Sequence, residues 1–163
     1  MIGELITYLL QAFPQLIAAF LGTLGFALVF KMKGSYLPFV SIGGFFTYAI
    51  FLTITFFGYS EFIAALISAI FVALLSETLA RILKAPTVIF LTTVSISIVP
   101  GSSLYYSMRY LLLQELDSFS QAFKSTCFIA AGIVCGIVII SVFMKIFMAI
   151  KTQIFSHHQQ NIK

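Results

Sequence analysis

The sequence predicts an all-α integral membrane protein, a bundle of about five transmembrane helices. Its 163 residues are 61% hydrophobic and only 9% charged, and the mean hydropathy is +1.10. A soluble domain carries about a quarter charged residues, so this chain has too little polar surface to cover itself in water. Several apolar stretches also reach the roughly 20 residues that a crossing helix needs. We expect residues 1–163 to form a single transmembrane helical domain.

The expected spans follow one another with short polar connections. They cover about residues 5–30, 37–57, 62–83, 87–113 and 125–150. The last connection, QELDSFSQAFK at 114–124, is the longest. Proline is tolerated in the first turn of a helix, where the missing N–H has no partner to lose. Pro14 therefore indicates a helix that begins near it, and Pro86 marks the start of the fourth span.

Basic residues predict the orientation of the chain. Seven of the nine lie at the end of or after the first, third and fifth spans: Lys31, Lys33, Arg81, Lys84, Lys145, Lys151 and Lys163. Arg109 and Lys124 fall near the other side. Lys and Arg concentrate on the cytoplasmic side of membrane proteins, which puts the N-terminus outside and the C-terminus in the cytoplasm. Every basic loop falls on the cytoplasmic side only if the fourth span crosses the membrane once and is not a re-entrant hairpin.

Small residues predict where the helices pack. Gly132 and Gly136 form a GxxxG pattern on the fifth span, and Ala65, Ala69 and Ala73 recur at i+4 on the third. Lipid tails are as apolar as Leu, so helices associate through close approach of small residues and not through hydrophobic burial. We interpret these stripes as ordinary helix-packing surfaces.

The fourth span is expected to be broken or kinked at Pro100-Gly101. Pro100 removes a backbone donor and frees carbonyl groups near Ile96. Lipid offers those groups no partner, so a break is tolerated only where protein or a water-filled cavity covers it. Interrupted helices build substrate sites in many transporters, and the amides that start the second half-helix suit a carboxylate. The alternative is a simple kink whose free carbonyls accept hydrogen bonds from Ser and Thr.

Hydroxyl residues surround the break and form the candidate substrate site. Thr93, Ser97 and Gly101 share one helix face at i+4 spacing. Arg109, about two turns beyond Pro100, would attract an anionic substrate or extend its side chain to the interface. The candidates from the residues themselves are Thr93, Ser97, Pro100, Gly101, Ser102, Ser103 and Arg109.

Glu77 and Arg81 are the other candidates, for ion coupling or for a local ion pair. Their i,i+4 spacing, with the acid first, favours a pair on one helix face. No GxSxG, HExxH or nucleotide-binding motif occurs in the sequence, and the cysteines lack metal spacing. We expect no enzyme activity, no cofactor and no metal, and, without a basic cluster on a polar face, no nucleic-acid partner.

The run KAPTVIFLTTVSISIVPGSSLYYSM at 84–108 resembles the threonine/serine exporter (ThrE) family, in particular its small membrane-only (YjjB-like) subunit. GFALVF at 25–30 is also similar, and the resemblance covers most of residues 20–110. Its motif positions here are Pro100, Gly101, Ser102, Ser103 and Tyr105.

The resemblance implies a subunit of a secondary transporter in the bacterial inner membrane. With a larger membrane subunit, it would export a small carboxylate-bearing metabolite: threonine, serine or a dicarboxylate such as succinate. Self-association into a homo-oligomer is a further expectation. The alternative is a non-transporting scaffold that stabilises the larger partner.

Overall fold

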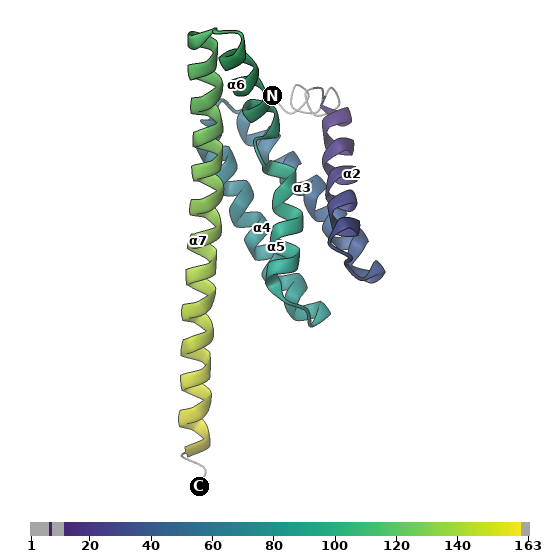
Figure 1. The fold of residues 1–163 in the computed structure, drawn as a ribbon. Coiled ribbons are helices and arrows are strands. Elements are labelled where there is room, and N and C mark those ends of the chain that lie inside the picture. The colour runs from purple at the N-terminus through teal and green to yellow at the C-terminus, as the bar shows by residue number, and fades with distance from the viewer. Residues whose placement is uncertain (1–6, 8–11, 161–163) are drawn as a thin grey trace.

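A computed structural model describes residue 7 and residues 12–160, with side chains described up to residue 147. In this part of the chain all regular structure is helical. The elements are α2 (Phe13–Val29), the 3₁₀ turn η1 (Gly34–Tyr36), α3 (Leu37–Phe56), α4 (Glu61–Leu83), α5 (Thr87–Ser95), the 3₁₀ turn η2 (Ile96–Ile98), α6 (Gly101–Leu112) and α7 (Leu116–Gln160). Figure 1 shows them as one bundle of long helices beside the still longer α7. The expected all-α membrane bundle is confirmed.

Each expected span has a counterpart among these helices. By length and composition α3, α4 and α7 can cross a membrane, and α5 with η2 and α6 forms a bent pair that adds a fourth crossing as one span. α2 has 17 residues in the described part and is shorter than a full span. Residues 5, 6 and 8–11 of the expected first span lie outside the described residues, as do residues 1–4 before it.

The bent pair changes direction by 53° and does not reverse. Beyond the break, α6 continues toward the end of the bundle where α7 begins (Figure 1). This course agrees with a single crossing of the fourth span. The side of the membrane that each end faces stays a prediction from the charges.

Prolines stand at the start of four helices, where a missing N–H costs no hydrogen bond. α2 and α3 each carry proline in the first turn, Pro86 is the N-cap residue of α5, and Pro100 is that of α6. α4 begins differently, since the Ser60 hydroxyl accepts a hydrogen bond from the Ile63 N–H at 3.4 Å. It ends at Lys84 in the left-handed conformation, with φ of 50°.

The connection between α6 and α7 is much shorter than the expected loop at 114–124. α7 already begins at Leu116, and the turn is made by Gln114 in the left-handed region, with φ of 59°. Glycine or asparagine usually marks such a helix end, and Gln gives no such signal in the sequence. As a result α6 and the first turns of α7 form an antiparallel hairpin (Figure 1).

Close contact between α4 and α7 confirms the packing role of the GxxxG pattern. A Cβ atom added to Gly132 would lie 2.6 Å from the Phe62 carbonyl oxygen and 2.9 Å from the Ala65 Cβ. At Gly136 it would lie 2.7 Å from both the Leu66 carbonyl oxygen and the Ala69 Cβ. Only glycine allows the two backbones to come this near, so the motif serves packing within the chain.

We predict that Gly136→Ala destabilises the protein while Gly25→Ala does not. The new methyl group at Gly136 would overlap backbone, for which about 1–3 kcal/mol is a typical loss. A Cβ at Gly25 meets nothing within 4 Å, and Ala favours a helix over Gly by about 1 kcal/mol. Thermal unfolding of the purified proteins in detergent measures the difference. Equal midpoints for the two variants would contradict the packing role.

Labelling of two loops in intact cells tests the predicted orientation. With Cys127→Ser and Cys135→Ser as background, Ser35→Cys lies beside the basic residues between α2 and α3, and Tyr59→Cys lies between α3 and α4. A membrane-impermeant maleimide should label Cys at position 59 and spare position 35, because positive loops stay cytoplasmic. The reverse pattern would place the N-terminus inside.

Candidate functional site

The break at Pro100 is an interruption of the helix, with a turn of its own. α5 tightens into η2, Val99 is extended, and Pro100 has φ of −76° and ψ of 57°. These angles match an inverse γ-turn, which the Gly101 N–H closes by donating to the Val99 carbonyl at 2.7 Å. α6 begins at Gly101, directly after Pro100 as its N-cap residue.

The chain changes its neighbours at this turn. Before it, η2 packs against α2 and α3; after it, α6 packs against α7. Hydroxyl groups just before the turn bond to the preceding carbonyls: Ser97 Oγ donates to the Val94 carbonyl at 2.9 Å and Ser95 Oγ to the Thr92 carbonyl at 3.1 Å. Protein therefore flanks the break before and after the turn, while Val99 and Gly101 at the turn itself are exposed.

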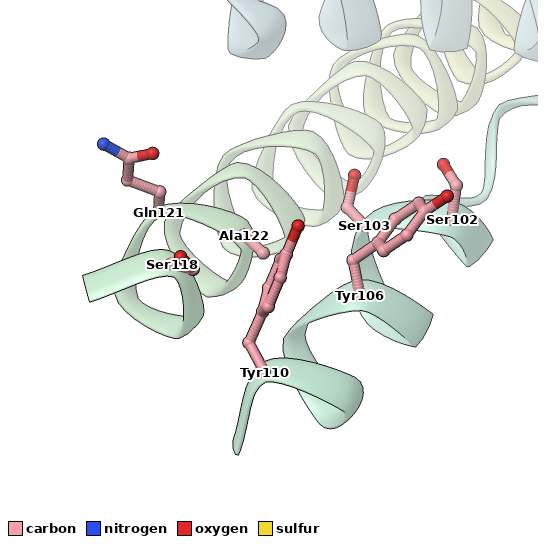
Figure 2. A pocket seen from close by; sticks show the side chains of 7 residues that line it. All are labelled: Ser102, Ser103, Tyr106, Tyr110, Ser118, Gln121 and Ala122. Atoms are coloured by element: carbon pink, nitrogen blue, oxygen red, sulfur yellow. The ribbon is translucent and has the colours of Figure 1, made fainter. Parts of the chain in front are cut away.

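A cavity of about 300 Å³ lies between α6 and α7; we refer to it as the α6–α7 cavity. It is lined by Ser102, Ser103, Tyr106, Tyr110, Ser118, Gln121 and Ala122. Figure 2 shows the Tyr110 side chain rising from α6 beside Ala122 of α7, and the Tyr106 ring beside Ser102 and Ser103. Next to the cavity, the hydroxyl oxygens of Ser103 and Ser125 are 3.4 Å apart.

The polar faces of the hairpin lie along the contact between its two helices, with Tyr106 and Gln121 still exposed. On α6 the residues at 103, 106, 107 and 110, and on α7 those at 118, 121, 122 and 125, follow i, i+3, i+4, i+7 spacing, which puts each set on one helix face. The opposite face of α6 exposes Leu104, Met108, Leu111 and Leu112. An apolar exterior around a polar interior is the arrangement that lipid favours, and it creates a polar seam along the hairpin.

Tyrosines distinguish the inside of the seam from its outside. The rings of Tyr106 and Tyr110 stack with centroids 6.2 Å apart and both line the cavity. Tyr105, which the family motif singled out, is 65% exposed and lies outside the cavity. Arg109 is also exposed and is not among the lining residues. Among the described residues that line this cavity none is basic.

Thr93 and Ser97 do not join the residues of the α6–α7 cavity. Thr93 is fully buried, and its hydroxyl is directed to the Ile89 carbonyl at 2.8 Å and the Met32 sulfur at 3.4 Å. Ser97 lines a second cavity of about 300 Å³, here termed the α2–α3–η2 cavity. Its lining is Gln15, Ala18, Ala19, Gly22, Thr23, Tyr48, Ile96 and Ser97.

Glu77 and Arg81 form an ion pair on α4, away from both cavities. Their Oε2 and Nη2 atoms are 3.8 Å apart, with Arg81 48% and Glu77 22% exposed. A local pair of this kind contributes little to stability, because solvent screens it. Among the residues that the structure describes, no cluster of His, Cys, Asp and Glu has the geometry of a metal site.

Sequence reasoning missed the α7 side of the cavity and the inward role of two tyrosines. Ser118 and Gln121 fall in the stretch expected to be a loop, and Tyr106 and Tyr110 were not among the candidate site residues. The signal was nevertheless in the sequence: small and polar residues recur at helical spacing from 118 to 125, opposite those of α6.

Comparison with protein families matches residues 15–143 to the threonine/serine exporter, ThrE. Comparison with curated proteins and with solved structures gave no match. The match spans most of the chain, from the first turn of α2 into the second half of α7. Members of this family are membrane transporters and not enzymes, and the several apolar helices agree with a multi-pass membrane protein. The chain belongs to the threonine/serine exporter (ThrE) family and is a membrane transport component of that type.

Proposed function

We propose that this chain is the membrane subunit of a secondary transporter that exports threonine or serine together with a larger membrane subunit. The observation that carries the proposal is the polar α6–α7 seam, which lies beside the helix break and opposite the exposed apolar face of α6. Hydroxyl and amide groups at membrane depth are costly unless they serve packing or a polar solute. A solute passing along this seam would give them partners.

The lining of the α6–α7 cavity favours an amino acid over a dicarboxylate. Ser102 and Ser103 belong to the first turn of α6. The backbone N–H groups of a first turn have no partner within the helix, and they attract negative charge. These N–H groups can bind one carboxylate. The second carboxylate of succinate would need a cation, and the described lining holds none. Serine and threonine carry one carboxylate each, and their ammonium group would find acceptors in the hydroxyl and amide oxygens of the lining.

The energy for uphill export would come from an ion gradient or from the partner. The sequence contains no nucleotide-binding motif. Glu77 is an acid within α4 and away from its first turn, so it is the residue we assign to ion coupling, with Arg81 as its resting partner. We place the assembly in the bacterial inner membrane, with the basic loops in the cytoplasm.

We predict that Tyr110→Phe lowers threonine export and Tyr105→Phe does not. Both variants remove one hydroxyl from α6, but only that of Tyr110 belongs to a residue lining the cavity. Loss of one hydrogen bond to the solute is worth about 0.5–1.5 kcal/mol, or roughly 2- to 10-fold in affinity. Efflux of radiolabelled threonine from loaded cells measures it, normalised to protein level. A selective defect in Tyr105→Phe would move the site outside the cavity.

We predict that vesicles reconstituted with this chain and its larger partner export serine and threonine under a pH gradient, and that neither protein does so alone. Radiolabelled serine, threonine and succinate are compared in the same vesicles. Succinate should be a poor substrate, because its second carboxylate lacks a cation in the cavity. Full transport by the partner alone would instead identify this chain as a scaffold.

A further inference from the structure

We infer that the α2–α3–η2 cavity is a second binding station for the exported amino acid, separated from the α6–α7 cavity by the turn at Pro100. This inference rests on the proposed export function and extends it to a path with two stations. Ser97 lines one cavity and Ser102 the other, so the two stations lie on either side of the break. Movement of α6 about the turn would open the way between them.

Hydrogen bonding within the second cavity leaves groups suited to an amino acid. The Tyr48 hydroxyl donates to Gln15 Oε1 at 3.2 Å, so the amide nitrogen of Gln15 keeps its two N–H donors for a carboxylate. Ser97 Oγ uses its proton on the Val94 carbonyl and keeps its lone pairs for an ammonium or hydroxyl group. None of the described lining residues carries a charged side chain. A small neutral or zwitterionic solute matches this set.

Small residues keep the second cavity open. Ala18, Ala19 and Gly22 form its α2 wall. A Cβ at Gly22 would meet nothing within 4 Å, whereas one at Gly44 would overlap the Thr23 side chain. Gly44 is therefore explained by packing. Gly22 leaves free space on the α2 side of the cavity. The volume of about 300 Å³ is at the lower end for ligand pockets and suits a solute of the size of serine or threonine.

α6 has the features of a movable wall. Of its residues, all within the described part of the chain, only Ser107 is buried. A Cβ at Gly101 would meet nothing within 4 Å, so the pivot is not clamped by neighbours. Few buried contacts make an element open at low free-energy cost. The turn at Pro100, closed by the Gly101 N–H, gives the movement a defined hinge.

The test is protection of engineered cysteines by the solute, in membranes that contain the complete exporter. The background is Cys127→Ser with Cys135→Ser. Ser97→Cys probes the second cavity, Ser118→Cys the α6–α7 cavity, and Ser95→Cys, which lines neither, is the control. A small methanethiosulfonate reagent is added with and without threonine. We expect threonine to slow modification of positions 97 and 118 several-fold and to leave position 95 unchanged.

The outcomes separate this inference from the proposed function. Protection at 118 without protection at 97 overturns the second station and leaves export along the seam intact. Protection at 97 but not at 118 supports the α2–α3–η2 cavity as a site and overturns the seam. Protection at neither, together with absent threonine efflux, overturns both proposals.

Gly101→Ala tests the hinge separately from binding. The methyl group has room, so the protein should fold, but alanine narrows the conformations open to the pivot. We expect threonine protection at positions 97 and 118 to persist while threonine efflux falls several-fold. Gly25→Ala, also at a glycine with free space but away from the break, should leave efflux unchanged. Unchanged efflux in Gly101→Ala would overturn the hinge.

Discussion

The contact between α4 and α7 is the interaction on which the polar part of the molecule depends. Two glycines let α7 approach the Phe62 and Leu66 carbonyls closely, and in lipid such contact is what holds helices together. It fixes the position of α7 along the bundle, and α7 in turn places Ser118 and Gln121 opposite α6. Since α6 buries little of itself, its polar face is matched only because α7 is held in this register.

The break at Pro100 combines the two alternatives that the sequence left open. As in a kink, Ser95 and Ser97 bond to carbonyls one turn earlier. Yet the helix also stops, since Val99 is extended and the Gly101 N–H turns back to the Val99 carbonyl. The hydroxyls reduce the cost of unpaired backbone in lipid, which allows the chain to leave α2 and α3 and continue along α7.

The sequence predicted the helices better than it predicted which of their side chains face the core or a cavity. Composition, prolines and the GxxxG pattern gave the class, the starts of the helices and the main contact, since these follow from local chemistry. Thr93, Ser97 and Gly101 do not share one helix face as their i+4 spacing predicted. The reason is that a 3₁₀ turn has 3.0 residues per turn and Val99 is extended. Helical register is lost across such a segment, so Thr93 faces the core while Ser97 faces a cavity. The start of α7 was hidden because Gln114 occupies a turn position that glycine usually marks.

A path lined by neutral groups has a consequence for the proposed export. Hydroxyls, amides and first-turn N–H groups attract a zwitterion through partial charges, so each station would bind it weakly. Conduction needs sites that the solute enters readily and also leaves, and a fully charged partner at either station would slow release. Arg109, exposed on α6 and outside both cavities, is placed where it can attract an anion without holding it in the path. On this view, the rate of export is set by movement of α6 at Pro100 and not by release from a tight site.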